Sequence, residues 1–177
     1  MNLFHRVLWQ KNILSIQARK ENCALLFIPG CSFLTDFRPI VTMNQNLLPF
    51  EWSELKRYAI SLLTLKWLLL RYSQSSSFKK ANGIIFLSKY AQDTVLNRIG
   101  TFDGYKAIIP HGLDSRFFTK QKKNILSIRN SEEKPIRIIY VSSIEPYKHQ
   151  LNVIDAILML RESGVLVSLD LIGQGNK

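Results

Sequence analysis

The chain has 177 residues, enough to bury a hydrophobic core, and its composition, 46% hydrophobic and 21% charged, excludes a disordered tail. Its 24 Lys and Arg residues outnumber 13 Asp and Glu residues, which gives a net charge of +11. A basic excess of this size predicts attraction to an anionic partner: phospholipid headgroups, nucleic acid or phosphorylated substrates. Charge alone does not choose among these classes.

The N-terminal stretch, 1–20, is mixed and amphipathic and lacks the apolar core and small-residue cleavage site of a secretory signal. Cys23 and Cys31 match no metal-ligand spacing and are predicted to be reduced thiols in the core. The histidines are scattered along the chain, so no metal site is predicted. Together these features predict a cytoplasmic protein.

Short apolar runs alternate with helical patterns along the whole chain. The runs predicted to be strands are 24–28, 39–43, 83–87, 107–109, 136–141 and 165–172. Nearly continuous apolar runs of this kind are typical of parallel strands that helices cover on both faces. Because strands and helices alternate, the sequence predicts an α/β fold with right-handed crossovers.

The segment 51–72 is predicted to form one long helix that carries Trp, Leu, Lys and Arg residues. Its apolar run, 62–70, contains Lys66 and is too short to span a bilayer, which takes about 20 apolar residues. A basic amphipathic helix with Trp fits an anchor on an anionic membrane surface, and the alternative is a helix packed on the sheet; the sequence leaves both open. The serine run that follows, 75–77, is predicted to be a loop or a frayed helix end.

Two further helices have recognisable ends. The first is predicted to begin at the N-cap Ser88 and to end at Gly100, and the second to end near Gly164. Their apolar residues recur at helical spacing: Ala91, Val95, Leu96 and Ile99 in the first, and Leu151, Ile154, Ile157 and Leu158 in the second. Between them, the polar and charged stretch 119–134 predicts a linker between a first domain, 1–118, and a second that starts at 135.

Small and polar residues follow most of the predicted strands. In open α/β sheets ligands bind beyond the carboxyl ends of the strands, so these are the candidate site residues. They are Gly30; Asn44, Gln45 and Asn46; His111, Gly112 and Asp114; Ser142, Ser143 and Lys148; and Gly173 and Gly175. Each has an ordinary alternative, because Gly and Asn are common turn residues and Lys148 fits a solvated helix start.

The order of these segments resembles the GT-B glycosyltransferases of family 4 (glycosyl transferases group 1). The segment Pro110-His111-Gly112-Leu113-Asp114 followed by Phe117-Phe118 is similar to the family's Pro-Asn-Gly-Val-Asp…Phe segment, which closes the first domain. The segment 138–148 looks like the strand and loop that open the second domain, and 169–175 like its second strand and Gly-x-Gly turn. The segment 83–96 looks like a strand of the first domain followed by a helix that starts at Ser. The resemblance covers most of the chain.

The resemblance implies a two-lobed enzyme with Rossmann-like halves that transfers a sugar, with retention, from a nucleotide-sugar donor to a glycan or lipid acceptor. Ser142, Ser143, Lys148, Gly173 and Gly175 would contact the donor, with Lys148 against a diphosphate whose charge an ammonium stabilises as the bond breaks. Gly30, Asn44, Gln45, Asn46, His111, Gly112 and Asp114 would line the acceptor cleft. The resemblance assigns no catalytic residue, no metal and no cofactor. It also favours peripheral contact with the inner face of the membrane.

The chain departs from the family pattern at several places. Ser142 and Ser143 stand where many members have Gly and a basic residue, and 44–46 has no His where many members have one. The family's Glu-x7-Glu segment and its first strand with a Gly-rich loop are not in the sequence. We therefore expect a chain truncated at both ends, with an incomplete first lobe and the first β-α-β unit of the second, 135–177. By this interpretation the chain on its own is inactive and poorly soluble, because strand edges are left unpaired.

Two functions remain open on the sequence: a glycosyltransferase fragment, or a non-catalytic remnant that binds a membrane surface or a partner chain. A nucleic-acid-binding module is disfavoured. The chain shows no helix-turn-helix, zinc-finger or single-strand-binding pattern, and its basic residues are dispersed.

Overall fold

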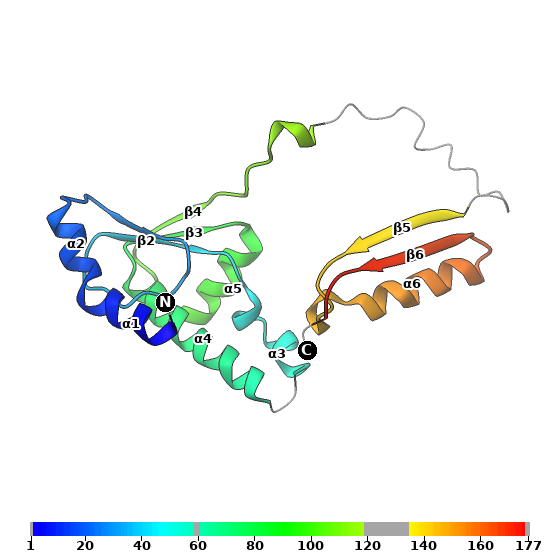
Figure 1. Cartoon of the computed structure of the whole chain (residues 1–177), viewed down its shortest axis with the longest axis horizontal. Coiled ribbons are helices and arrows are strands. Elements are labelled where there is room, and N and C mark those ends of the chain that lie inside the picture. Colours follow the sequence, from blue (N-terminus) through cyan, green and yellow to red (C-terminus); the bar gives the residue numbers. More distant parts are fainter. Residues whose placement is uncertain (1, 59–60, 119–134, 176–177) are drawn as a thin grey trace. The chain divides into compact units, whose positions relative to one another are not determined.

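A computed structural model describes residues 2–58, 61–118 and 135–175 of the chain. The chain divides into two compact units, Met1–Gly112 and Leu113–Lys177, which are described one at a time (Figure 1). The predicted linker, 119–134, lies outside the described residues. The predicted first domain, 1–118, extends a little beyond the end of the first unit.

The described elements of the first unit alternate between helices and strands. They are α1 (Leu3–Asn12), α2 (Leu14–Lys20), β1 (Leu26–Ile28), β2 (Ile40–Asn44), the 3-10 turn η1 (Leu48–Phe50), α3 (Trp52–Lys56), α4 (Leu62–Lys80), β3 (Gly83–Phe86), α5 (Lys89–Ile99) and β4 (Tyr105–Ile108). Those of the second unit are η2 (Ser115–Phe117), β5 (Ile136–Val141), η4 (Pro146–Lys148), α6 (Gln150–Glu162) and β6 (Val167–Ile172).

The strands of the first unit form a parallel sheet in the order β1-β2-β3-β4. When strands follow one another in sequence order, right-handed crossovers place their connecting helices on one face, and α4 and α5 lie on the same side of this sheet (Figure 1). The core fills the space between that face and the helices. Its most buried members are Ile40, Ile84, Phe86, Phe78 and Val95. The predicted α/β fold with a parallel sheet is confirmed.

The other face of this sheet differs from the prediction, which had helices on both faces. Phe27 and Tyr105 point to it and are 47% and 88% exposed. All four residues of β4 are exposed, because β4 is an edge strand with β3 on one side only. The apolar composition of the strands therefore overstates their burial.

The predicted helix 51–72 is two helices. α3 ends at Lys56, where the N–H groups of Arg57 and Tyr58 turn back to the carbonyls of Glu54 and Leu55 at 3.1 and 3.2 Å. Ser61 then caps α4, because its hydroxyl accepts a hydrogen bond from the N–H of Thr64 at 3.2 Å. The apolar periodicity hid this N-cap, since leucines continue on both sides of the break.

Contrary to the prediction of a loop or a frayed helix end, the serine run 75–77 lies inside α4, which continues to Lys80. Ser77 is buried, and its hydroxyl accepts a hydrogen bond from the N–H of Phe33 at 3.1 Å. Tertiary contact with the loop after β1 thus offsets the weak helix propensity of serine. Among the described residues, no helix combines the length and the apolar character needed to cross a bilayer.

Both predicted ends of α5 are confirmed. The Ser88 hydroxyl accepts from the N–H of Ala91 at 3.1 Å, and Gly100 ends the helix with φ +80°, a conformation that suits glycine. The predicted apolar face is buried at Val95 and Ile99. α5 therefore starts at the carboxyl end of β3 and returns to the amino end of the sheet.

The second unit is a single β-α-β crossover. β5 and β6 pair in parallel, from Ile136 opposite Val167 to Val141 opposite Ile172. α6 covers one face, where Ile157 and Val167 are buried. The other predicted apolar positions of α6 are less covered, and Leu151 and Leu158 are exposed, because two strands are narrower than the apolar face of the helix.

Candidate functional site

The loops after β5 and β6 run side by side beyond the carboxyl end of the strands. The N–H of Ser142 donates to the carbonyl of Ile172 at 3.0 Å, and the N–H of Ile144 donates to that of Gln174 at 3.2 Å. Ile144 and Gly175 also form a parallel bridge. The structure thus brings together two of the predicted sets, the serine pair 142–143 and the Gly-x-Gly turn 173–175.

Gly173 makes the closest approach in this group. A Cβ added at this position would lie 1.7 Å from the carbonyl oxygen of Ser142, far inside any possible contact. At Gly175 the nearest atom to an added Cβ is Ile144 Cβ at 3.9 Å, an ordinary contact. The first glycine of the turn is therefore required by the packing of the two loops, whereas the second is not.

Gln150, the first residue of α6, binds the serine loop and was not predicted. Its side-chain amide donates to the Ser142 hydroxyl at 3.0 Å and to the Ser143 carbonyl at 2.8 Å. These two bonds fix the loop against the start of the helix. The only signal in the sequence for this contact is the position of Gln150 just after Lys148 and His149.

Lys148 lies at the end of η4, next to the same edge. Its carbonyl accepts a hydrogen bond from the Tyr140 hydroxyl at 2.7 Å, which ties the turn to the end of β5. Its Nζ lies 5.1 Å from the centre of the Tyr147 ring, and no ion pair joins it to a carboxylate of the described residues. Lys148 is thus a half-buried residue in a turn whose backbone is tied to the end of β5.

In the first unit, the loops after β1 and β2 also meet. The Cys31 thiol donates to the Met43 carbonyl at 3.0 Å. Asn44 is buried, and its amide donates to the Asn46 carbonyl at 3.4 Å, while the Asn46 side chain accepts from the N–H of Leu48 at 3.0 Å. The amides therefore shape the loop. Of the predicted residues here, Gly30, Gln45 and Asn46 are exposed to solvent.

The two cysteines differ. Cys31 is buried, and burial is the main cause that raises the pKa of its thiol above the usual value. Cys23 is exposed, so the prediction of two core thiols is wrong for Cys23. It follows α2 in a turn where Asn22 has φ +51°, outside the layer that packs on the sheet.

The predicted site residues after β4 do not lie with those in the loops after β1 and β2. β4 is separated from β2 by β3, and His111 and Gly112 are exposed at the end of the first unit. Asp114 belongs to the second unit, where its carboxylate caps η2 by accepting from the N–H of Arg116 at 2.9 Å. No cluster of three potential metal ligands occurs within the part of the chain that the structure describes.

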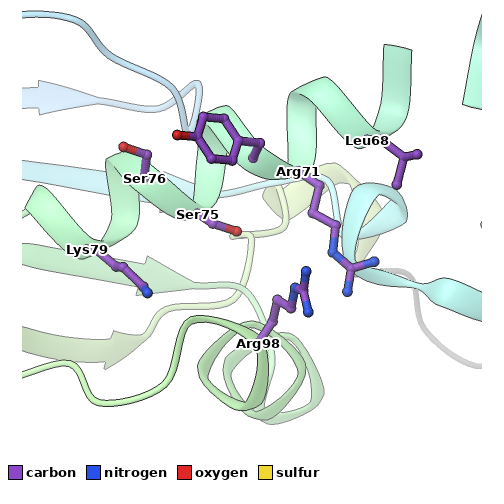
Figure 2. A pocket seen from close by; sticks show the side chains of 7 residues that line it. Leu68, Arg71, Ser75, Ser76, Lys79 and Arg98 are labelled. Carbon is purple, nitrogen blue, oxygen red and sulfur yellow. The ribbon is translucent and has the colours of Figure 1, made fainter. Parts of the chain in front are cut away.

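A hollow of about 420 Å³ lies on the helix side of the first unit, and none of the predicted site residues lines it. Its lining is formed by Leu68, Arg71, Tyr72, Ser75, Ser76, Lys79 and Arg98 (Figure 2). α4 supplies all of these residues except Arg98, which comes from the last turn of α5. No local pattern predicts this hollow, because it forms only where α4 and α5 pack beside one another.

No protein-family model matches the chain, and no curated protein matches it either. Any functional conclusion therefore depends on the residues and the geometry described above.

Proposed function

We propose that the chain belongs to a GT-B glycosyltransferase of family 4, in which the second unit contacts the diphosphate of a nucleotide-sugar donor. The activity would be retaining transfer of the sugar to a glycan or lipid acceptor. One observation carries the proposal: the serine loop 142–143, the turn at Gly173 and Lys148 lie at one carboxyl edge of parallel strands. Ligands of open α/β sheets bind at such edges.

The chemistry of the reaction explains why these residues suit a diphosphate. Breaking the bond to the sugar leaves negative charge on the diphosphate, and a positioned ammonium stabilises that charge. Lys148 supplies the ammonium, and the Tyr140 bond at 2.7 Å holds its backbone in place. The contacts of Gln150 and Gly173 fix the neighbouring loops before any ligand binds, so little ordering is left to be done on binding. The proposal includes no metal and no cofactor.

The proposed acceptor cleft is lined by the exposed predicted residues beyond the carboxyl ends of the strands of the first sheet. These are Gly30, Gln45, Asn46, His111 and Gly112. Asn44 is buried and would act on the acceptor only through the shape of its loop.

The donor site is tested by titrating the chain with UDP and with GDP. Replacing Lys148 with Ala is expected to weaken binding by about 1–3 kcal/mol, because the diphosphate loses a charged hydrogen-bond partner. The matched control is Arg161→Ala, which removes a cation from the last turn of α6, at the far end of the helix. Equal affinity of the Lys148 variant and the parent would remove Lys148 from the site. A folded chain that binds neither nucleotide would contradict the donor site as a whole.

A second candidate function is binding to an anionic membrane surface without turnover. The first half of α4 supports it, because Leu62 and Leu69 are 88% and 62% exposed. A second hollow, of about 600 Å³, is lined there by Ser61, Leu62, Thr64, Leu65 and Leu68. Exposed apolar patches of this kind mark interaction surfaces. The nearby Lys56 and Lys66 favour an anionic membrane over a neutral partner.

This candidate is tested by co-sedimentation with vesicles. The double change Leu65→Ser and Leu69→Ser is expected to reduce binding to anionic vesicles by about tenfold or more, since two exposed leucines lose their apolar burial. Leu158→Ser and Met159→Ser, on exposed positions of α6, form the matched control. Self-association of the chain that the double change abolishes, with no vesicle binding, would favour a partner chain instead.

A further inference from the structure

The hollow between α4 and α5 collects positive charge without any balancing acid. Its charged lining residues are Arg71, Lys79 and Arg98, and the rest are uncharged. Figure 2 shows the guanidinium groups of Arg71 and Arg98 directed toward one another across the hollow. Like charges in this arrangement repel, so the fold holds these side chains together at an electrostatic cost.

Arg71 is the unusual member of the set. Lys79 and Arg98 stand in the last turns of their helices, where a cation is ordinary because it faces the helix carbonyls. Arg71 stands in the middle of α4 and is half-buried, with its guanidinium carbon 5.4 Å from the centre of the Trp52 ring. Burial, and then the charge of Arg98, lower the pKa of Arg71 from its usual value. Helix position therefore does not explain why an arginine occupies this site.

Two polar atoms of the hollow also have no partner. Arg71 Nε and the Ser75 hydroxyl oxygen are buried, and neither makes a hydrogen bond within the described residues. Leaving a buried polar group without a partner is destabilising, and more so when the group is charged. An anion in the hollow would relieve the repulsion between the arginines, and a turn of the Arg71 and Ser75 side chains would let both groups donate to it.

We propose that this hollow binds a phosphate group, held by Arg71 and Arg98 with Lys79, Ser75 and Ser76 as further donors. The planar guanidinium group donates two parallel hydrogen bonds to the oxygens of a phosphate, and arginine pairs are common in such sites. The volume of about 420 Å³ leaves room for an organic group that carries the phosphate. That group is either part of a soluble phosphate ester or a lipid headgroup, and the experiment separates the two.

The phosphate site and the proposed donor site share no residue. The residues of the phosphate site all belong to α4 and α5 in the first unit, whereas the donor residues belong to the second unit. Binding of UDP, which depends on Lys148 in the proposal above, is measured separately. Failure of the phosphate site and failure of the donor site are therefore distinguishable.

The experiment uses the full chain and two probes, inorganic phosphate and vesicles with or without phosphatidic acid. Arg98→Gln is expected to weaken binding about tenfold or more, because a charged hydrogen-bond donor is lost. Lys79→Gln provides the second variant, and Lys80→Gln, one residue away and outside the hollow, is the matched control for net charge.

Binding of inorganic phosphate that depends on Arg98 supports the site and indicates a soluble phosphate ester. Binding only to vesicles with phosphatidic acid, again dependent on Arg98, supports the site and indicates a lipid headgroup. The proposal is overturned if Arg98→Gln and Lys79→Gln behave like Lys80→Gln with both probes. It is equally overturned if the folded chain binds neither probe.

Discussion

At the scale of single residues, Gly173 has the strictest requirement in the second unit. Its missing side chain lets the turn after β6 lie directly against the carbonyl of Ser142. The neighbouring contacts from Gln150 to Ser142 and Ser143 depend on the same loop conformation. A change at this glycine is therefore expected to disturb the serine loop 142–143 and its contacts with Gln150.

Gly173→Ala is expected to lower the free energy of unfolding by about 1–3 kcal/mol or more, because the added methyl group forces the loops apart. It should also weaken the binding of UDP or GDP. Denaturation by urea, followed by far-UV circular dichroism, measures the first effect. Gly175→Ala is the matched control, since its added methyl meets Ile144 at 3.9 Å and should have a small effect. Equal unfolding curves for the two variants would contradict the packing argument.

Prediction of single site residues from the sequence succeeded where local backbone geometry decides which residues meet. The Gly-x-Gly turn and the serine loop were singled out because they follow strands, and the structure places them side by side. Gln150 was missed because its role depends on a contact across the turn η4. Arg98 was missed for a similar reason, since it meets Arg71 of the predicted basic helix only when α4 and α5 pack together.

At the scale of elements, the helix ends decide where the charged residues stand. Ser88 starts α5 at the carboxyl end of β3, and Gly100 ends it one residue after Ile99. This length places Arg98 in the last turn of α5, opposite the C-terminal half of α4. The cap of α5 thus contributes to the hollow between the two helices.

Ser88→Ala is expected to lower the free energy of unfolding by about 1 kcal/mol, the usual effect of losing an N-cap hydroxyl. The lost interaction is the 3.1 Å bond from the N–H of Ala91. Urea denaturation measures the change. Ser53→Ala, which removes an exposed hydroxyl from the first turn of α3, serves as the comparison. A Ser88 variant as stable as the Ser53 variant would show that another group satisfies the start of α5.

The strands were largely predictable, and the helices less so. β5 begins and ends as predicted, because an apolar run bounded by polar residues defines a strand locally. The break between α3 and α4 was not predicted, since a single serine N-cap competes with a leucine pattern that continues through the break. The helical serine run 75–77 depends on contact with the loop after β1, which no local pattern reveals.

At the scale of the whole chain, both units are one-sided layers of parallel strands and helices. α4 and α5 lie on one face of the first sheet, and α6 covers one face of the pair β5-β6. The sequence predicted that helices cover the strands on both faces, because the composition of the strands is apolar throughout. Burial depends on what packs on each face, and composition does not contain that information.

The strand order of the first sheet also has a consequence for how this unit forms. β1, β2, β3 and β4 are neighbours in the sheet in the same order as along the chain. Each strand therefore pairs with the strand that precedes it in the chain. Paired residues are 14 positions apart between β1 and β2, 42 between β2 and β3 and 22 between β3 and β4, so pairing β3 with β2 closes the longest loop and is expected to be the slowest step. The first sheet can thus grow stepwise, from β1 toward β4, as the chain leaves the ribosome.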